Sequence, residues 1–547
     1  MTGPAKRFLF GRALRSENIH STLLPKRIAL PVFASDALSS NAYATQEILL
    51  MLSVGGFALY SFTPWVALAV ILVFFVVVAS YRQNVRAYPS GGGDYEVVST
   101  NLGERAGVFV ASALMVDYVM TVAVSISSAV ANIASAFPPV GKQAVIVAVP
   151  LIVLMTMMNL RGVRESGTAF AIPTYGFIIG IFAMVAWGIW QISNGTVPQA
   201  ESATWTIEAE TTATGALLVF LLARAFSSGT TALTGIEAIA NGVPAFRKPK
   251  SKNAATTLLL LGLISMSMFA AITWLAMVTN VRITENNSDL IGLPPGQEQK
   301  TVIAQVSQAV FANFQPGYLY ISIMTALILV LAANTAFNGF PVLGSVLARD
   351  GYLPRQLHTR GDRLAFSNGI IFLAGAATVL VIVYDASVSS LIQLYVLGVF
   401  VSFTLSQIGM VRHWNRHLKE ETNPKERSRM KRSRIINTIG FLMTGSVLII
   451  VLVTKFTHGA YLVVIAMPIL YLIMRSVRKH YDRVAAELDV SADERVTLPS
   501  RVHAIVLVSK IHKPTLRALA YARASRPSTL EGVTVSVDPG DTKEMSA

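Results

Sequence analysis

The sequence predicts an all-α polytopic membrane protein with a short α/β segment at its C-terminus, and its composition supports this fold class. The chain has 547 residues, of which 53% are hydrophobic and only 14% charged, and its mean hydropathy is +0.54. Apolar runs long enough to cross a bilayer as helices recur along most of its length. This composition argues against a soluble enzyme, and the lack of cysteine excludes disulfide and thiol chemistry.

We expect twelve membrane-spanning helices. They lie at about 28–52, 63–80, 106–133, 143–159, 169–191, 215–243, 255–280, 316–333, 366–384, 388–411, 436–454 and 459–475. Residues 1–27 are then an N-terminal arm, which has no signal-peptide core, and residues 28–478 form the transmembrane domain. The remaining residues, 479–547, form a C-terminal segment.

The basic residues predict the orientation of these spans. With the boundaries above, 31 Lys and Arg residues lie in the arm, in alternate loops and after the last span, and only four lie in the opposite loops. Basic residues concentrate on the cytoplasmic side of membrane proteins. We therefore expect a multi-pass protein of the cell membrane with both termini in the cytoplasm. The net charge of +15 then reports topology and does not indicate nucleic-acid binding.

Two spans contain polar interruptions in corresponding places. The first is interrupted by SDALSSNAYAT, beginning at Ser35, and the sixth by AFSSGTTALTGIEAIANG, at 225–242. A matched pair of interrupted segments five spans apart predicts a transporter with a five-plus-five inverted repeat, followed here by two further spans. Substrate binds near the membrane midplane in such folds, where the breaks expose backbone groups.

The apolar pattern stops after Arg475, and a small α/β unit is expected near the end of the chain. HAIVLVS predicts a strand, KPTLRALAYARAS a helix and GVTVSVD a second strand, which together form one βαβ unit. One such unit buries too little surface to be stable alone. We therefore expect it to dock onto other parts of the assembly, or to be an incomplete part of a longer domain.

Ionisable side chains inside the spans are the candidate functional residues, because the hydrocarbon region penalises them. They are Asp36, Glu47, Asp117, Arg224 and Glu237. A packing seam of small residues would account for the serines of the first span but has no need of Asp36. Glu237 either lines a site or pairs with a neighbour such as Arg224, and for Glu47 a structural role at the outer end of its span is expected.

Neutral oxygen ligands accompany these acids. Asp117, Thr121, Ser125 and Ser128 are spaced so that they share one helix face, Thr234 lies at the break of the sixth span, and Tyr395 lies in the tenth. Acids and hydroxyl groups suit a desolvated cation, and buried acids also suit proton coupling. An acid in the first break disfavours an anionic ligand, although Asp36 could also pair with an α-amino group.

The segments LPVFASDALSSNAYATQEIL, RAYPSGGGDYEVVSTNLG and ARAFSSGTTALTGIEAIANGVPAFR resemble the amino acid–polyamine–organocation superfamily, and more closely its KimA-like potassium importers of the KUP family. The resemblance covers about residues 20–530. It implies twelve helices on the LeuT plan and import of K⁺ driven by the proton gradient, with no further cofactor.

By this resemblance, eight residues face the K⁺ path: Asp36, Tyr43, Asp117, Thr121, Ser125, Thr234, Glu237 and Tyr395. It places K⁺ itself at Asp36, Tyr43, Thr121, Ser125 and Thr234, and it makes Asp36, Asp117 and Glu237 the proton-coupling candidates. It also suggests a homodimer and control by cyclic di-AMP through a cytosolic domain, which is longer in the family than the βαβ unit expected here.

The alternatives belong to other functional classes. An amino-acid or polyamine permease of the same fold is the closest, whereas a channel would need a continuous pore and a membrane sensor would not need several acids within its spans. The sequence contains no GxxxxGK[ST] phosphate loop for ATP hydrolysis, so a gradient-driven carrier rather than an enzyme is expected.

Overall fold

The computed structural model describes residues 23–91, 93–161, 167–211, 213–358, 366–489, 501–508 and 512–534. The first 22 residues of the predicted arm and the predicted loop arginines Arg164, Arg360 and Arg363 lie outside these ranges. The contacts divide the chain into two compact units, Met1–Tyr481 and Asp482–Ala547.

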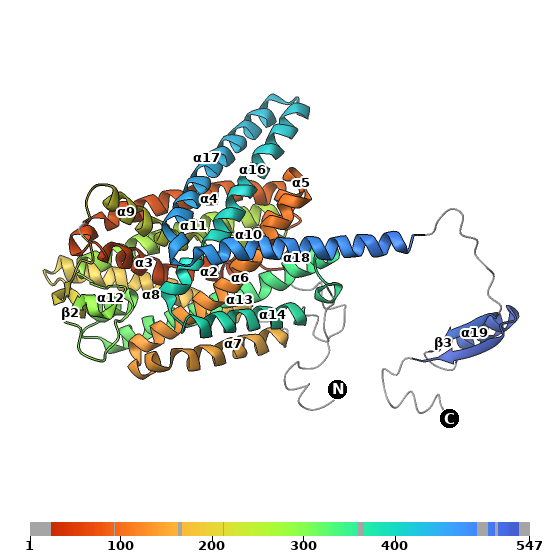
Figure 1. Cartoon of the computed structure of the whole chain (residues 1–547), viewed down its shortest axis with the longest axis horizontal. Helices are drawn as coiled ribbons and strands as arrows, with labels where there is room; N and C mark the ends of the chain where they lie inside the picture. Colours follow the sequence, from red (N-terminus) through yellow and green to blue (C-terminus); the bar gives the residue numbers. More distant parts are fainter. Residues whose placement is uncertain are drawn as a thin grey trace. The chain divides into compact units, whose positions relative to one another are not determined.

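The first unit is a bundle of helices (Figure 1). In chain order they are α2 (Lys26–Ser39), α3 (Asn41–Ser53), α4 (Thr63–Ala87), α5 (Gly93–Leu102), α6 (Glu104–Ala136), α7 (Ala144–Leu160), α8 (Gly167–Ser193), α9 (Gly215–Gly229), α10 (Ile236–Asn241), α11 (Lys250–Val278), α12 (Val302–Val310), α13 (Gln315–Arg349), α14 (Ser367–Val383), α15 (Val388–Leu394), α16 (Leu397–Glu420), α17 (Pro424–Lys455) and α18 (Ala460–Glu487), of which the first unit includes the part up to Tyr481.

Within the described residues, ten helical segments are long and apolar enough to cross a membrane. The predicted first span is instead divided into α2 and α3, of 14 and 13 residues, and α14 is an apolar helix of 17 residues. The protein is therefore a multi-pass helical membrane protein, and the count of twelve crossings stays a prediction.

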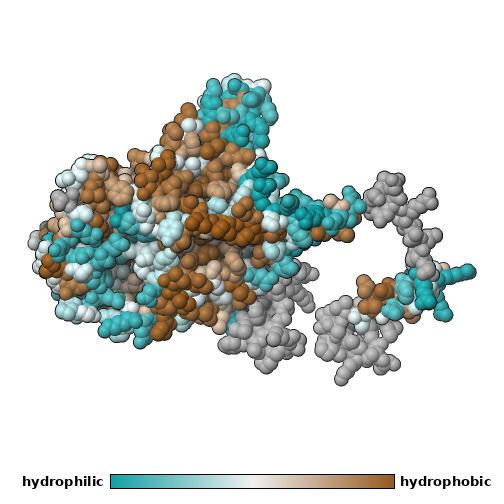
Figure 2. Space-filling model, in the orientation of Figure 1, coloured by the Kyte–Doolittle hydropathy of each residue, from teal (hydrophilic) through white to brown (hydrophobic). Residues whose placement is uncertain are grey.

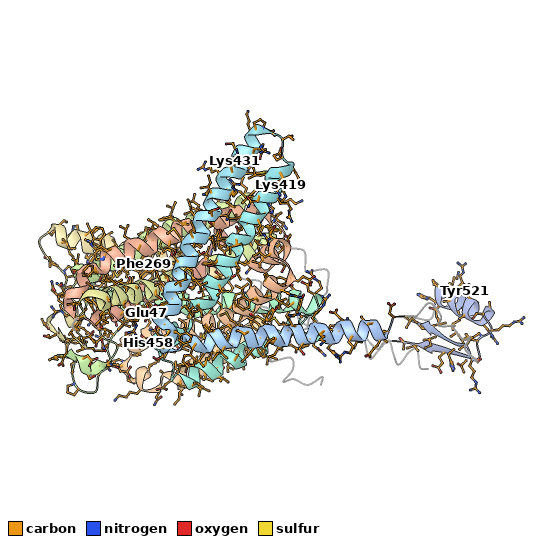
Figure 3. The ribbon with its side chains drawn as sticks, turned by 45° about the horizontal axis from the view of Figure 1, so that its top comes forward. Glu47, Phe269, Lys419, Lys431, His458 and Tyr521 are labelled. Carbon is orange, nitrogen blue, oxygen red and sulfur yellow. The ribbon has the colours of Figure 1, made fainter. Side chains whose placement is uncertain are left out.

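Large apolar side chains cover much of the outside of the bundle, as expected for a surface that faces lipid. Exposed examples on three different helices are Trp65, Ile172 and Val219. Figure 2 shows such residues over the side of the bundle, with hydrophilic residues over the end of the α16–α17 hairpin. Lys419 and Lys431 lie near that end (Figure 3). The apolar outer surface and the charged end of the hairpin agree with the alternation of apolar runs and basic loops in the sequence.

Helix α6 forms the centre of the bundle. Of its most apolar 18-residue window, 83% is buried, and it packs against α13, α5, α16, α14 and α7. It also contacts α15, which precedes α16 in the same membrane-length segment. A helix that is apolar and buried all round is surrounded by other helices rather than by solvent or lipid, so polar residues on α6 face the protein interior.

Three of the helical segments are interrupted within their length. α2 and α3 meet at Ser40, and α9 is separated from α10 by the short helix η5 (Thr230–Leu233) and an extended Thr234. α15 and α16 are separated by Tyr395 and Val396, where Val396 has a φ of +79°. Backbone groups released from helices inside a membrane must be buried in protein or line a polar cavity. The third break was not predicted from the sequence.

The loop between α8 and α9 and the loop between α11 and α12 are joined by a small strand pair. β1 (Thr206–Ile207) pairs antiparallel with β2 (Leu290–Ile291). The Arg282 guanidinium donates to the Trp205 carbonyl and lies over the Phe57 ring. The two longer loops are therefore joined to each other and to the segment before α4.

The second unit contains β3 (His503–Leu507), α19 (Lys513–Ala524) and β4 (Thr529–Val533), and the two strands pair in parallel. The second strand begins earlier than predicted, because the register pairs His503 with Thr529. The rest of the predicted strand, 535–538, lies outside the described residues. Tyr521 on α19 is 83% exposed within this unit (Figure 3).

Candidate binding site

The first two breaks lie against each other. The Ser40 hydroxyl is 2.9 Å from the Tyr43 hydroxyl and 3.1 Å from Thr234 Oγ1, so one serine connects α2, α3 and the break before α10. Ser39 and Ser40 both donate to the Asp36 carbonyl, at 2.8 and 3.1 Å. The serines of SDALSS therefore satisfy the backbone where α2 ends, and they place three hydroxyl groups together.

Gly235 brings the second break directly onto Asp36. It has a φ of +83°, and a Cβ added to it would lie 2.7 Å from Ala37 N and 2.9 Å from Asp36 Oδ2. Only glycine combines this backbone conformation with so close an approach at low cost. The glycine of TALTGIE thus fixes the distance between Asp36 and the start of α10.

The third break adds residues from α6 and from the predicted tenth span. The Tyr395 hydroxyl is 3.2 Å from Thr121 Oγ1, and Thr121 also donates to the Asp117 carbonyl at 3.0 Å. Ser125 is buried one helix turn further along α6. The unpredicted break after Tyr395 turns the chain where this tyrosine contacts α6.

Three buried carboxyl groups lie around these hydroxyls. Asp36, Asp117 and Glu237 are each 3% exposed, and each has one carboxyl oxygen without a hydrogen-bond partner in the described part of the chain. Asp117 interacts electrostatically with Asp36 and Glu237, and Glu237 with Asp36. The structure therefore gathers the three acids into one interacting cluster.

Arg224 does not pair with Glu237, which was one of the alternatives from the sequence. Its guanidinium is 3.7 Å from the Glu285 carboxylate in the loop after α11. Among the described residues, no cation pairs directly with the three acids of the cluster. The negative charge of the three acids can therefore be balanced by a bound cation or by a proton.

Glu47 belongs to a separate buried charge cluster that the sequence did not predict. Its carboxylate accepts from the Ser389 hydroxyl at 3.3 Å and interacts electrostatically with Lys455 and Arg224. Lys455, which directly follows the predicted span 436–454, is fully buried and donates to the Ile392 carbonyl at 3.1 Å. Figure 3 shows Glu47 inside the bundle. Glu47 thus takes a structural position, and α17 is anchored to α15.

A further buried acid, Asp94, lies in the first turn of α5. The Asp94 carboxylate accepts from the Tyr81 hydroxyl at 2.5 Å and from the Ser402 hydroxyl at 2.7 Å, and it is 2% exposed. Burial raises the pKa of the Asp94 carboxyl. The YPSGGGDY segment could have indicated this residue, because its glycines allow close packing: Gly93 has a φ of +55° and directly contacts Asn241 of α10.

The described residues of the assembled site therefore offer hydroxyl oxygens and carboxylates but no amine or guanidinium. The hydroxyls of Tyr43, Thr234, Thr121 and Tyr395 come from α3, α6 and two of the breaks, and they meet beside Asp36 and Asp117. A dehydrated cation can exchange its water ligands for such oxygens. An interacting set of buried acids can also exchange protons.

Three comparisons with known proteins bear on this arrangement. A family model described as amino acid permease matches residues 30–477. A model described as the KimA potassium transporter C-terminal domain matches residues 501–547. The potassium transporter KimA of Bacillus subtilis (strain 168) is 38% identical over 540 residues, which cover 99% of this chain and 84% of that protein.

Proposed function

The chain belongs to the amino acid permease family, as a relative of the potassium transporter KimA, and from this premise we propose that it imports K⁺ across the cell membrane together with protons. Membership of this family makes it a membrane transporter rather than an enzyme. The observation that carries the proposal is the cluster of hydroxyls and unpaired carboxyls at the three helix breaks.

We assign K⁺ to the oxygens of Asp36, Tyr43, Thr121, Ser125 and Thr234. A K⁺ ion loses its hydration shell only where protein oxygens replace the water. The hydroxyls of Tyr43 and Thr234 already meet at Ser40, and Asp36 supplies the negative charge beside them. Tyr395 positions Thr121 through their shared hydrogen bond.

Proton coupling is assigned to Asp36, Asp117 and Glu237. Interacting buried carboxyls share protons as a group instead of all carrying charge, and membrane transporters use such acids as relays. K⁺ binding next to Asp36 changes the electrostatic cost of a proton on Asp117 and Glu237, because the three groups interact. This linkage provides a physical route for symport.

The transport cycle is proposed to follow alternating access on a LeuT-like five-plus-five repeat with two further helices. The breaks of α2–α3 and α9–α10 meet at Ser40 and Thr234, as the paired breaks of an inverted repeat should. Twelve crossings result if the α2–α3 pair and α14 each span the membrane in addition to the ten long segments. The excess of basic residues then places both termini in the cytoplasm.

The C-terminal unit is proposed to carry control by cyclic di-AMP and contacts of a homodimer. The match of residues 501–547 to the KimA C-terminal domain supports a shared role for this unit. Its parallel β3–β4 pair is too small to be stable by itself. This favours packing of the unit against another protein surface.

Uptake by purified protein in proteoliposomes with an inward proton gradient tests the function. Rb⁺ tracer and labelled amino acids are offered side by side, and saturable Rb⁺ uptake that K⁺ competes away is expected. Asp36→Asn should fold but abolish this uptake, whereas the same change at the exposed Asp385 should leave it intact. Amino-acid uptake without Rb⁺ uptake would instead establish an amino-acid permease, and Rb⁺ uptake that ignores the proton gradient at a clamped potential would exclude symport.

A further inference from the structure

A small cavity adjoins Tyr43, beside the candidate K⁺ site. It has a volume of about 10 Å³, close to what one water-sized particle needs. Its polar lining comes from four helices or loops and consists of Tyr43, Gln46, Ser128, Asn132, Thr301 and Thr325. Among the described residues that line it, none carries a charge.

Three side-chain oxygens of this cavity have no hydrogen-bond partner in the described part of the chain. They are Ser128 Oγ and Asn132 Oδ1 on α6 and Thr325 Oγ1 on α13. The three residues are 5%, 2% and 0% exposed. Leaving a buried polar group without a partner costs free energy, so such groups in a native structure call for an explanation. Three such oxygens around one cavity indicate a ligand that interacts with all three of them.

The cavity continues the polar face of α6 that begins at the candidate site. At 100° per residue, Thr121, Ser125, Ser128 and Asn132 fall within an arc of about 60°, and Ser128 lies about 4.5 Å along the axis from Ser125. Thr121 contacts Tyr395 in the site, whereas Ser135, further along the same helix, contacts the loop residue Thr301. The polar face therefore runs from the site toward the loop before α12.

The start of α12 also contributes to the cavity, through Thr301 and Ile303. The Val302 amide donates to Gln46 Oε1 at 3.1 Å, and the Thr301 amide donates to Ser135 Oγ at 3.0 Å. These bonds join the start of α12 to α3 and α6. Two hydrogen bonds, each from a backbone amide to a side-chain oxygen, therefore hold the start of α12 beside the cavity.

We propose that Ser128, Asn132 and Thr325 form a second cation site, in which transported K⁺ is held, partly dehydrated, before it passes Tyr43 into the site at Asp36. This inference rests on the proposed function. Neutral oxygens suit such a station, because an ion that binds too tightly would not move on. Tyr43 lines both this cavity and the inner cluster, so the two sites share one ligand.

Kinetics of Rb⁺ uptake test this second site. Ser128→Ala and Thr325→Val each remove one ligand oxygen and should raise the apparent KM for Rb⁺ about fivefold, since one hydrogen-bond-sized interaction is worth ~1 kcal/mol. The maximal rate should stay near that of the unmodified protein. The matched control is Ser127→Ala: Ser127 is the neighbouring residue, equally buried and without a partner, but it does not line the cavity.

A binding measurement separates a cation from a trapped water. Asp36→Asn protein, which lacks the inner carboxylate, should retain weak equilibrium binding of Rb⁺, and adding Thr325→Val should remove it. Unchanged KM in Ser128→Ala and Thr325→Val, or no residual Rb⁺ binding to Asp36→Asn, would show that the cavity holds water only. Unmodified protein that neither binds nor transports Rb⁺ would overturn both this site and the proposed function.

Discussion

Replacing Gly235 with alanine tests whether the close contact between the second break and Asp36 sets the geometry of the site. The added methyl group would lie 2.7 Å from Ala37 N and 2.9 Å from both Asp36 Cβ and Asp36 Oδ2. These atoms belong to α2 itself, so the contact can be relieved only if α2 and the break move apart.

The expected cost has two parts. A left-handed backbone conformation costs an alanine about 1–2 kcal/mol, and forcing a methyl group into a packed interior costs roughly another 1–3 kcal/mol. Gly215→Ala is the matched control, because Gly215 also has a positive φ, of +57°, but has open space where the Cβ would be. The difference between the two variants, about 1–3 kcal/mol, therefore isolates the contact with Asp36.

The assay is Rb⁺ uptake in proteoliposomes together with the thermal unfolding midpoint in detergent. If the difference of about 1–3 kcal/mol is lost from the binding of the ion, kcat/KM for Rb⁺ should fall about 5- to 150-fold in Gly235→Ala relative to Gly215→Ala. Equal uptake and equal stability in the two variants would refute the reasoning, because Asp36 would then tolerate a shifted break.

Three further predictions concern the other buried groups and the C-terminal unit. Lys455→Met should destabilise the protein, by up to about 3–5 kcal/mol, because it removes the stronger of the two cations that interact with Glu47, and the double variant with Glu47→Gln should recover most of this loss; additive shifts in the unfolding midpoint would contradict this coupling. Burial raises the pKa of Asp94, so its stabilising effect at low pH should be lost as the pH rises from about 3.9 through that raised value, and Asp94→Asn should flatten the pH dependence of the unfolding midpoint. Removing residues 490–547 should preserve Rb⁺ uptake but alter its control, since the contacts place these residues in a separate unit; a protein that no longer folds would show a structural role instead.

The sequence predicted the polar breaks of the first and sixth spans because they depart sharply from their apolar surroundings. Ser40, Thr234 and Gly235 stand at those breaks in the structure. The break at Tyr395 and Val396 left no such trace, because LYVLGVF is apolar and neither residue is a glycine or proline. Its conformation is imposed by packing against α6, which no local pattern records.

The candidate acids were predictable for the same reason as the breaks, since an ionisable residue inside an apolar run is conspicuous. Their mutual proximity was not, because it depends on how α2, α6 and α10 pack. The burial of Lys455 was not predictable, because this residue follows an apolar run and precedes FTHG, which is typical of a loop. Only the folded bundle shows that its ammonium group reaches the carbonyl of Ile392.

The division of the first span into two short helices has a consequence for biosynthesis. A translocon accepts a segment into lipid when its summed transfer free energy is favourable, and a central Asp opposes this by about 2.5–3.5 kcal/mol. The α2–α3 segment carries Asp36 and Glu47, and neither half is long enough to span the membrane alone. We therefore expect the nascent chain to integrate α2–α3 stably only after α4, the first long apolar helix, has emerged from the ribosome. Asp36, which we propose as a ligand of the transported ion, would thus delay the first step of assembly.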